Sequence, residues 1–315
     1  MPSNLSPLGA LPARFRRQRI LIVGCGDVGL RVASALGAGK GHGPRLLALT
    51  STPARQPALR RAGVTPLAGN LDDPGSLRRL AGLANRVVHL APPPQDRGPT
   101  DPRTRALLDA LRLRTPAAAL VYGSTTGVYG DCSGARVQEV RRLTPHTPRA
   151  QRRVDAEASV RHFGRSGVRA TLLRIPGIYA QDRSGGTPKE RLLKRTPVLR
   201  AQDDVYTNHI HADDLARACV LALWRGRPQR AVNVCDDTDM KMGDYFDLAA
   251  DLMGLPRPPR VSRSEADRAL PLMLLSFMNE SRRLDNTRMK TELGLRLRYP
   301  HVREGLGMQG NLFLS

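Results

Sequence analysis

Three glycines with the spacing G-x-G-x-x-G carry the pattern that most directly predicts chemistry in this chain. Gly24, Gly26 and Gly29 follow a short run of branched apolar residues at 20–23 and precede apolar residues that recur every four positions over 28–36. A strand, a glycine turn and a helix in that order are the context in which this fingerprint binds a dinucleotide. The glycines permit a tight turn, a close approach of the backbone to a pyrophosphate, and close packing of helix on strand. The sequence therefore predicts dinucleotide phosphates at the helix N-terminus; the alternative is a glycine turn that binds nothing.

The residues after the next apolar run, 45–50, bear on which dinucleotide binds. About 20 residues past the glycines, such folds usually carry an acid for the ribose 2′-hydroxyl. Here the chain has Thr50, Ser51 and Arg55, with no acid between them. Arginine binds phosphate through charge-assisted hydrogen bonds, so this composition suits a 2′-phosphate. We therefore expect NADP, with NAD as the alternative; the competing interpretation is that Arg55 points into solvent.

These residues need a sheet to position them, and the hydrophobic pattern predicts one. Strands are expected at 20–23, 45–50, within 63–73, and at 86–91, 118–123, 170–175 and 231–235, with helices at 73–83, 102–113, 149–163 and 213–224, and a mostly helical 240–315. Strands that alternate with helices in this rhythm favour an α/β fold with a parallel, doubly wound sheet. Asp213 is expected to cap the helix that follows it.

Charge and composition limit the partners. The chain has 315 residues and a formal net charge of +22, but its basic residues are scattered over the whole length, and only five Phe and one Trp are available to stack on bases. We therefore expect no specific nucleic-acid site, only weak attraction to polyanions at low salt. We expect the partner to be a small-molecule substrate and the protein to be a monomer or a homodimer.

The cysteines and the apolar runs indicate in which cellular compartment the protein is expected. The four cysteines lie far apart, without a C-x-x-C pair, at Cys25, Cys132, Cys219 and Cys235. This spacing predicts no metal site and no disulfide framework, and suits a reducing cytosol. Residues 1–18 have no long apolar core and are interpreted as a flexible leader, and the apolar stretch at 270–278 is too short to span a bilayer. A cytoplasmic protein without a membrane span is expected.

Five motifs in order carry a resemblance to a known family. They are Gly24–Gly29, the run S-T-T-G-V-Y-G at 124–130, the run L-R-I-P-G-I-Y at 173–179, the run N-H-I-H-A-D-D at 208–214, and S-R-R-L-D-N at 281–286 before E-L-G at 292–294. With these motifs the chain resembles the extended short-chain dehydrogenase/reductase superfamily, in its NAD-dependent epimerase/dehydratase branch, over nearly its whole length.

The resemblance implies a Rossmann-type domain and a smaller, discontinuous C-terminal substrate domain. We assign 19–181 plus 212–237 to the first and 182–211 plus 238–315 to the second. The expected cofactor contacts are Gly24, Gly26, Asp27, Val28, Gly29, Thr50, Ser51, Arg55, Asn70, Leu71, Leu90, Ala91 and Pro176. Asn70 stands where the family often has an Asp near adenine, and Ala91 with the prolines after it replaces a small polar turn.

The family's catalytic residues map onto this chain with two replacements. In the family a Ser or Thr holds the substrate oxygen, a Tyr transfers the proton, and a Lys four residues later lowers the pKa of that Tyr. The hydroxyl falls on Thr125. Glu157 matches the acid that follows the Lys, which puts Arg153 at the Lys position and Arg149 at the Tyr position. A guanidinium stays protonated, with a pKa above about 12, so Arg149 cannot shuttle a proton near neutral pH. Arg153 could hold ribose hydroxyls or support a developing anion.

Two functions remain open on this basis. The first is an NAD(P)-dependent oxidoreductase or epimerase with a replacement acid/base group. Tyr129 is the best candidate for that group, although a packing role is as well supported, and His146 is a weaker one. Arg149 and Arg153, one helical turn apart, would favour an anionic substrate. The second is a non-catalytic NAD(P)-binding sensor or interaction protein. His89, His209 and His211 are expected to be structural.

Overall fold

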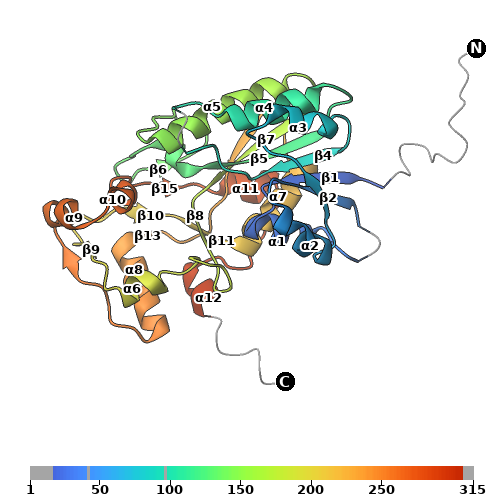
Figure 1. The fold of residues 1–315 in the computed structure, drawn as a ribbon. Coiled ribbons are helices and arrows are strands. Elements are labelled where there is room, and N and C mark those ends of the chain that lie inside the picture. The colour runs from blue at the N-terminus through green and yellow to red at the C-terminus, as the bar shows by residue number, and fades with distance from the viewer. Residues whose placement is uncertain (1–16, 41–42, 96–97, 308–315) are drawn as a thin grey trace, which may run out of the picture.

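A seven-stranded parallel sheet forms the centre of the computed structural model, which describes residues 17–40, 43–95 and 98–307 (Figure 1). The strand order is β12-β7-β5-β4-β1-β2-β3, and every neighbouring pair is parallel. The strands are β1 (Arg19–Val23), β2 (Arg45–Thr50), β3 (Thr65–Ala68), β4 (Arg86–His89), β5 (Ala119–Thr125), β7 (Arg169–Ile175) and β12 (Arg230–Asn233). The order reverses between β1 and β4, and ligands of such folds bind at the carboxyl ends of the strands beside that reversal. The predicted doubly wound α/β fold is confirmed.

Helices cover both faces of the sheet (Figure 1). One face carries α3 (Pro74–Leu77), α4 (Pro102–Arg112) and α5 (Pro148–Gly164); the other carries α1 (Asp27–Ala35), α2 (Gln56–Arg61), α7 (Ala212–Arg225) and α11 (Thr287–Glu292). Alternate residues of β1 enter the two cores, because successive side chains of a strand point to opposite faces. Ile20 and Ile22 pack with Val32 of α1, whereas Leu21 and Val23 pack on the side of α4 and α5.

A third apolar cluster lies outside the sheet, in the region expected to form the substrate domain. It includes Leu192, Phe246, Ala249, Val302 and Leu306. The elements there are α6 (Lys189–Leu193), β9 (Val198–Leu199), β10 (Tyr206–Thr207), β13 (Met240–Lys241), α8 (Met242–Met253), β14 (Arg260–Val261), α9 (Arg263–Ala269), α10 (Leu272–Met278) and α12 (Val302–Gly307). The division at 182–211 plus 238–315 stays a prediction.

Helix α11 departs from that division, because its buried Met289 belongs to a sheet-side core rather than to the third cluster. Two short parallel pairs bridge the regions: β8 (Gly177–Tyr179) with β11 (His209–His211), and β6 (Arg136–Val137) with β15 (Arg283–Leu284). Of the predicted leader, residues 1–16 lie outside the described residues.

Two local predictions differ from the structure. The helix expected at 73–83 ends early: α3 is followed by the 3-10 turn η3 (Arg78–Leu80). The expected cap of α7 is wrong, because His211 occupies the N-cap and its Nδ1 accepts a hydrogen bond of 3.2 Å from the backbone N–H of Asp213. The Asp213 carboxylate is paired instead with Arg31, 182 residues away in the chain, at 2.5 Å.

Within the described ranges, no helix combines the length and the apolar character needed to cross a membrane. In the same ranges, no group of three or more His, Cys, Asp or Glu side chains is arranged to hold a metal ion. All four cysteines are buried free thiols.

Candidate cofactor and substrate site

The glycine loop between β1 and α1 is shaped by three different constraints. Gly24 has φ of +85°, and a Cβ there would lie 2.3 Å from the backbone nitrogen of Ala91. A Cβ on Gly29 would lie 2.9 Å from the carbonyl oxygen of Gly24. Around Gly26, by contrast, no described atom beyond Gly26 and its two chain neighbours lies within 4 Å of the Cβ position. The protein's own packing thus requires two of the glycines, whereas the third borders open space.

That open space adjoins the N-terminus of α1. Gly26 is the N-cap and provides no side chain to bond the first N–H groups of the helix. Such N–H groups, together with the helix dipole, favour an anion. Leu90 and Ala91, which follow β4, lie against the start of the glycine loop, since their backbone nitrogens donate to the carbonyl of Val23 at 2.7 and 3.2 Å. The residues present therefore fit the pyrophosphate of a dinucleotide.

The residues predicted to read the adenosine end lie beside the same loop. The Arg55 guanidinium donates from Nη2 to the carbonyl oxygen of Cys25 at 2.7 Å, so it lies against the glycine loop although its side chain is exposed. Ser51 is exposed, while the Thr50 hydroxyl accepts from the N–H of Thr52 at 3.2 Å. The Asn70 side chain accepts from the N–H of Asp72 at 3.1 Å and so stabilises its own loop.

Thr125 ends β5 at the side of the sheet where a substrate would lie. It is partly exposed, and its Oγ1 accepts a long hydrogen bond of 3.4 Å from the N–H of Gly127. A Cβ on Gly127 would be 3.8 Å from both that hydroxyl and the Cβ of Ala150, so the first turn of α5 packs beside Thr125. Arg149 belongs to this turn. Its side chain is exposed, and no described residue accepts a hydrogen bond from its guanidinium. Partial burial of that group, with the neighbouring Arg153 charge, lowers the pKa of Arg149.

Arg153 is placed differently from Arg149, although both belong to α5. It is buried, and its Nη1 donates to the carbonyl of Gly123 at 2.7 Å and to the hydroxyl of Tyr122 at 3.0 Å. Its Nε is shielded from solvent and bonds to no described residue. The guanidinium is therefore fixed against β5, two residues before Thr125, while Arg149 remains open to ligand and water.

Tyr129 does not fit the predicted role of proton donor. Its side chain is fully buried, its hydroxyl donates to Asn233 Oδ1 at 2.7 Å, and it accepts from Arg174 Nη1 at 2.9 Å. Burial is the main cause that raises its pKa to about 12, although Arg174 acts in the opposite direction. A general acid must reach the reacting atom, and this hydroxyl is enclosed by the protein.

A buried ionic network surrounds Tyr129, and it was not predicted from the sequence. Glu157 accepts from Ser124 Oγ at 2.7 Å and from Arg174 Nε and Nη2 at 3.1 and 2.8 Å. Both charged side chains are 2% exposed. A charge is tolerated at this depth only when it is paired and hydrogen-bonded. These motif residues therefore hold β5, β7 and α5 together. An arginine inside the apolar run of β7 was the signal that could have pointed to them.

The histidines expected to be structural are enclosed. His89 Nε2 lies 2.9 Å from the Thr104 hydroxyl, and burial, with a smaller effect of Arg153, lowers the pKa of His89 to about 3. His209 stacks on Tyr245 with ring centroids 4.1 Å apart, and burial lowers its pKa to about 3 as well.

His146 is exposed, unlike those histidines, and it lies just before α5. Its ring lies against Gly130, where a Cβ would be 2.8 Å from the imidazole Cδ2.

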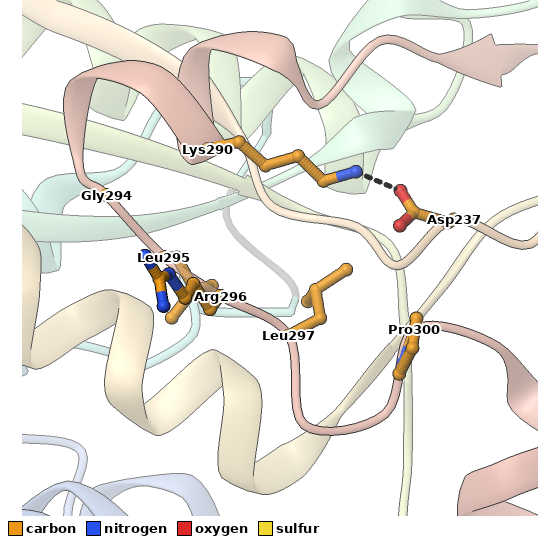
Figure 2. A pocket seen from close by; sticks show the side chains of 7 residues that line it. All are labelled: Asp237, Lys290, Gly294, Leu295, Arg296, Leu297 and Pro300. Carbon is orange, nitrogen blue, oxygen red and sulfur yellow. Dashed lines mark hydrogen bonds and ion pairs between the residues drawn. The ribbon is translucent and has the colours of Figure 1, made fainter.

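A surface depression of about 510 Å³ lies elsewhere in the molecule, and Figure 2 shows its lining. Asp237, Lys290, Gly294, Leu295, Arg296, Leu297 and Pro300 form it. Lys290 Nζ and Asp237 Oδ1 pair at 2.5 Å, so these opposite charges satisfy each other. None of the predicted site residues lines this depression, and we assign it no ligand.

Comparison with known proteins decides the family. Residues 20–235 match the NAD dependent epimerase/dehydratase family. The chain belongs to this family. The match runs from the first residues of the glycine-loop strand to the end of β12, so it spans the sheet and the candidate site. Family and site together describe an NAD(P)-binding protein of oxidoreductase or epimerase type.

Individual relatives of this epimerase/dehydratase protein are distant. A functionally unknown conserved protein from Silicibacter pomeroyi is 31% identical, with a TM-score of 0.76 over 92% of this chain and 97% of that one. A UDP-glucuronic acid 4-epimerase from Bacillus cereus, solved with UDP-glucuronic acid and NAD, is 18% identical, with a TM-score of 0.71 over 92% and 96%, and shows the fold alone.

A 3-diazoavenalumate denitrifying reductase from a Streptomyces species is 29% identical over 143 residues, which are 45% of this chain and 46% of that relative. The match thus spans about half the length of this curated relative.

Proposed function

We propose that this epimerase/dehydratase-family protein binds NADP at the glycine loop and acts as an oxidoreductase or epimerase on a small, anionic substrate. The open space beside Gly26, at the N-terminus of α1, is the observation that carries the cofactor proposal. Arg55 supports NADP over NAD, because its guanidinium lies against the loop and has further N–H groups for a 2′-phosphate.

Bound NADP would supply hydride transfer. On the protein side, the Thr125 hydroxyl orients the substrate oxygen. The exposed Arg149 cation, on the neighbouring turn of α5, stabilises negative charge that develops on that oxygen. Because a guanidinium does not release its proton near neutral pH, the proton comes from water or from a side chain other than Arg149.

An anionic substrate is part of the proposal because of the charge at this end of α5. Arg149 makes no ion pair with a described residue, and the guanidinium of Arg153 lies deeper on the same helix. A phosphate or carboxylate on the substrate would provide the missing partner for Arg149. A positively charged substrate would be repelled.

The alternative is a non-catalytic NAD(P)-binding sensor or interaction protein. It is favoured by the enclosure of Tyr129 and Arg153, whose polar groups are engaged inside the protein. Product formation from a panel of sugar nucleotides and small carbonyl compounds, measured with NADP or NADPH present, separates the two, because an epimerase regenerates its cofactor and consumes no NADPH. The enzyme proposal expects a substrate-dependent rate that Arg149→Gln lowers, whereas the sensor proposal expects tight binding without turnover on any member.

We also propose a cytoplasmic location and a monomeric or homodimeric state. The buried free thiols suit a reducing compartment. Fractionation and light scattering test these two statements independently of the site.

A further inference from the structure

The loop 180–186 folds back on itself next to the N-terminus of α1. Gly186 and Ala180 close it, since the N–H of Ala180 donates to the Gly186 carbonyl at 3.2 Å. From this loop Arg183 Nη1 reaches Asp27 Oδ2 at 2.5 Å. Asp27 is the first residue of α1 and directly follows the glycine that borders the open space. A loop that leads into the expected substrate domain therefore places a guanidinium beside the proposed pyrophosphate position.

The charges around Asp27 make this contact significant. Arg31 pairs with three carboxylates: Asp27 at 3.2 Å, Asp182 at 2.6 Å and Asp213 at 2.5 Å. Arg183 pairs with Asp27 among the described residues. Two guanidinium groups thus face three carboxylates, and the cluster is formally negative. This net negative charge opposes the attraction that the helix N-terminus exerts on a pyrophosphate, and the opposition is relieved when one of the cluster's cations also binds the phosphates.

Arg183 is the cation with capacity for a second anion. All three bonding nitrogens of Arg31 are committed to carboxylates, and its side chain is 14% exposed. The side chain of Arg183 is 27% exposed, and only its Nη1 is engaged with Asp27. A guanidinium offers five N–H donors in a planar fork, so it can bridge a carboxylate and a phosphate at the same time.

We propose that Arg183 binds the pyrophosphate of the dinucleotide while remaining beside Asp27, so that the loop 180–186 closes over the cofactor from the substrate side. The inference rests on the proposed cofactor site and adds to it a residue far in sequence from the glycine motif. Because NAD and NADP share the pyrophosphate, Arg183 contributes equally to both, in contrast to Arg55.

Calorimetric titration of NADP, NAD and ADP-ribose into four proteins tests this: wild type, Arg183→Gln, Asp27→Asn and the double variant. Arg183→Gln should lower the affinity for all three ligands by roughly tenfold or more, the loss typical of one charge-assisted hydrogen bond. Asp27→Asn should bind at least as tightly as wild type, because it removes a repelling carboxylate. The double variant should stay weaker than Asp27→Asn by roughly the same tenfold factor.

The competing interpretation is that Arg183 only neutralises Asp27. In that case the double variant would bind as tightly as Asp27→Asn, and the proposal would be overturned. Arg257→Gln is the matched control, since Arg257 pairs with Asp251 at 2.8 Å on an exposed surface and its loss removes the same charge. It should leave all affinities unchanged, and thermal melts verify that each variant is folded.

The outcomes also separate this inference from the proposed function. If wild type binds none of the three ligands, the cofactor site itself is wrong. If wild type binds and the Arg183→Gln affinities equal those of wild type, the cofactor site stands and the role of Arg183 is refuted.

Discussion

Replacing Arg55 tests the specificity proposal. In Arg55→Gln the guanidinium that lies 2.7 Å from the Cys25 carbonyl is lost, while a polar side chain remains. Hydrogen bonds to charged groups contribute about 1.5–3 kcal/mol, and the exposure of Arg55 argues for the lower end of that range. A loss of about 1.5 kcal/mol corresponds to roughly tenfold in the dissociation constant for NADP. The dissociation constant for NAD, which has no 2′-phosphate, should change little.

Arg60→Gln provides the control for this experiment. Arg60 is exposed on α2 and bonds to Gln56 at 3.2 Å, so the same charge is removed from the neighbouring helix without touching the glycine loop. Fluorescence or calorimetric titration with both cofactors gives the two affinity ratios. Equal weakening of NAD and NADP in Arg55→Gln would mean that Arg55 only supports the loop. Equal or tighter NAD binding by the wild type would refute the preference for NADP.

Three further predictions concern the protein around the site. Glu157→Leu leaves Arg174 buried without its partner, so urea unfolding should show a loss of about 3–5 kcal/mol; a loss within error would contradict the network. Tyr129→Phe should cost about 1–2 kcal/mol of stability and leave any turnover intact, whereas lost turnover at unchanged stability would restore its catalytic role. Burial raises the pKa of Asp236 from 3.8 to about 8, so the folded state keeps a proton that the unfolded chain releases. The free energy of unfolding should therefore fall as pH rises between those two values; Asp236→Asn should remove that slope, and an unchanged slope would show that Asp236 is not the group with the raised pKa.

The cofactor loop could be predicted from the sequence because its chemistry is local. The glycine spacing, the strand before it and the helix after it lie within 16 consecutive residues, 20–35. The parallel sheet was predictable for the same reason, since each strand carries its own apolar run. Positive φ at Gly24 and the close approach of Ala91 explain why glycine occupies that position.

The depth of a side chain could not be predicted in this way. Arg149 and Arg153 are four residues apart on one helix. From this spacing alone, both side chains were predicted to face the same substrate crevice. The structure separates them, because Arg153 is buried and donates to the carbonyl of Gly123, whereas the side chain of Arg149 is exposed. Tyr129 likewise follows Thr125 closely, yet its hydroxyl turns inward to Asn233, 104 residues away.

Long-range ion pairs gave no local signal either. Arg183 is one of many scattered arginines, and nothing in its neighbourhood marks it as a partner of Asp27, 156 residues earlier. Its placement depends on how the loop after β8 folds back over α1. Only the assembled sheet brings these segments together.

The variant Gly26→Asp tests whether the glycine loop binds a dinucleotide. The backbone at this position has φ of −80°, and beyond the two chain neighbours no described residue lies within 4 Å of the Cβ position, so the variant should fold. Its carboxylate would project into the space proposed for the pyrophosphate. Ser34→Asp, at an exposed position near the other end of α1, adds the same charge as a control. In calorimetry we expect wild type and the control to bind NADP and folded Gly26→Asp to show no measurable binding; an unchanged affinity in Gly26→Asp would contradict the cofactor site.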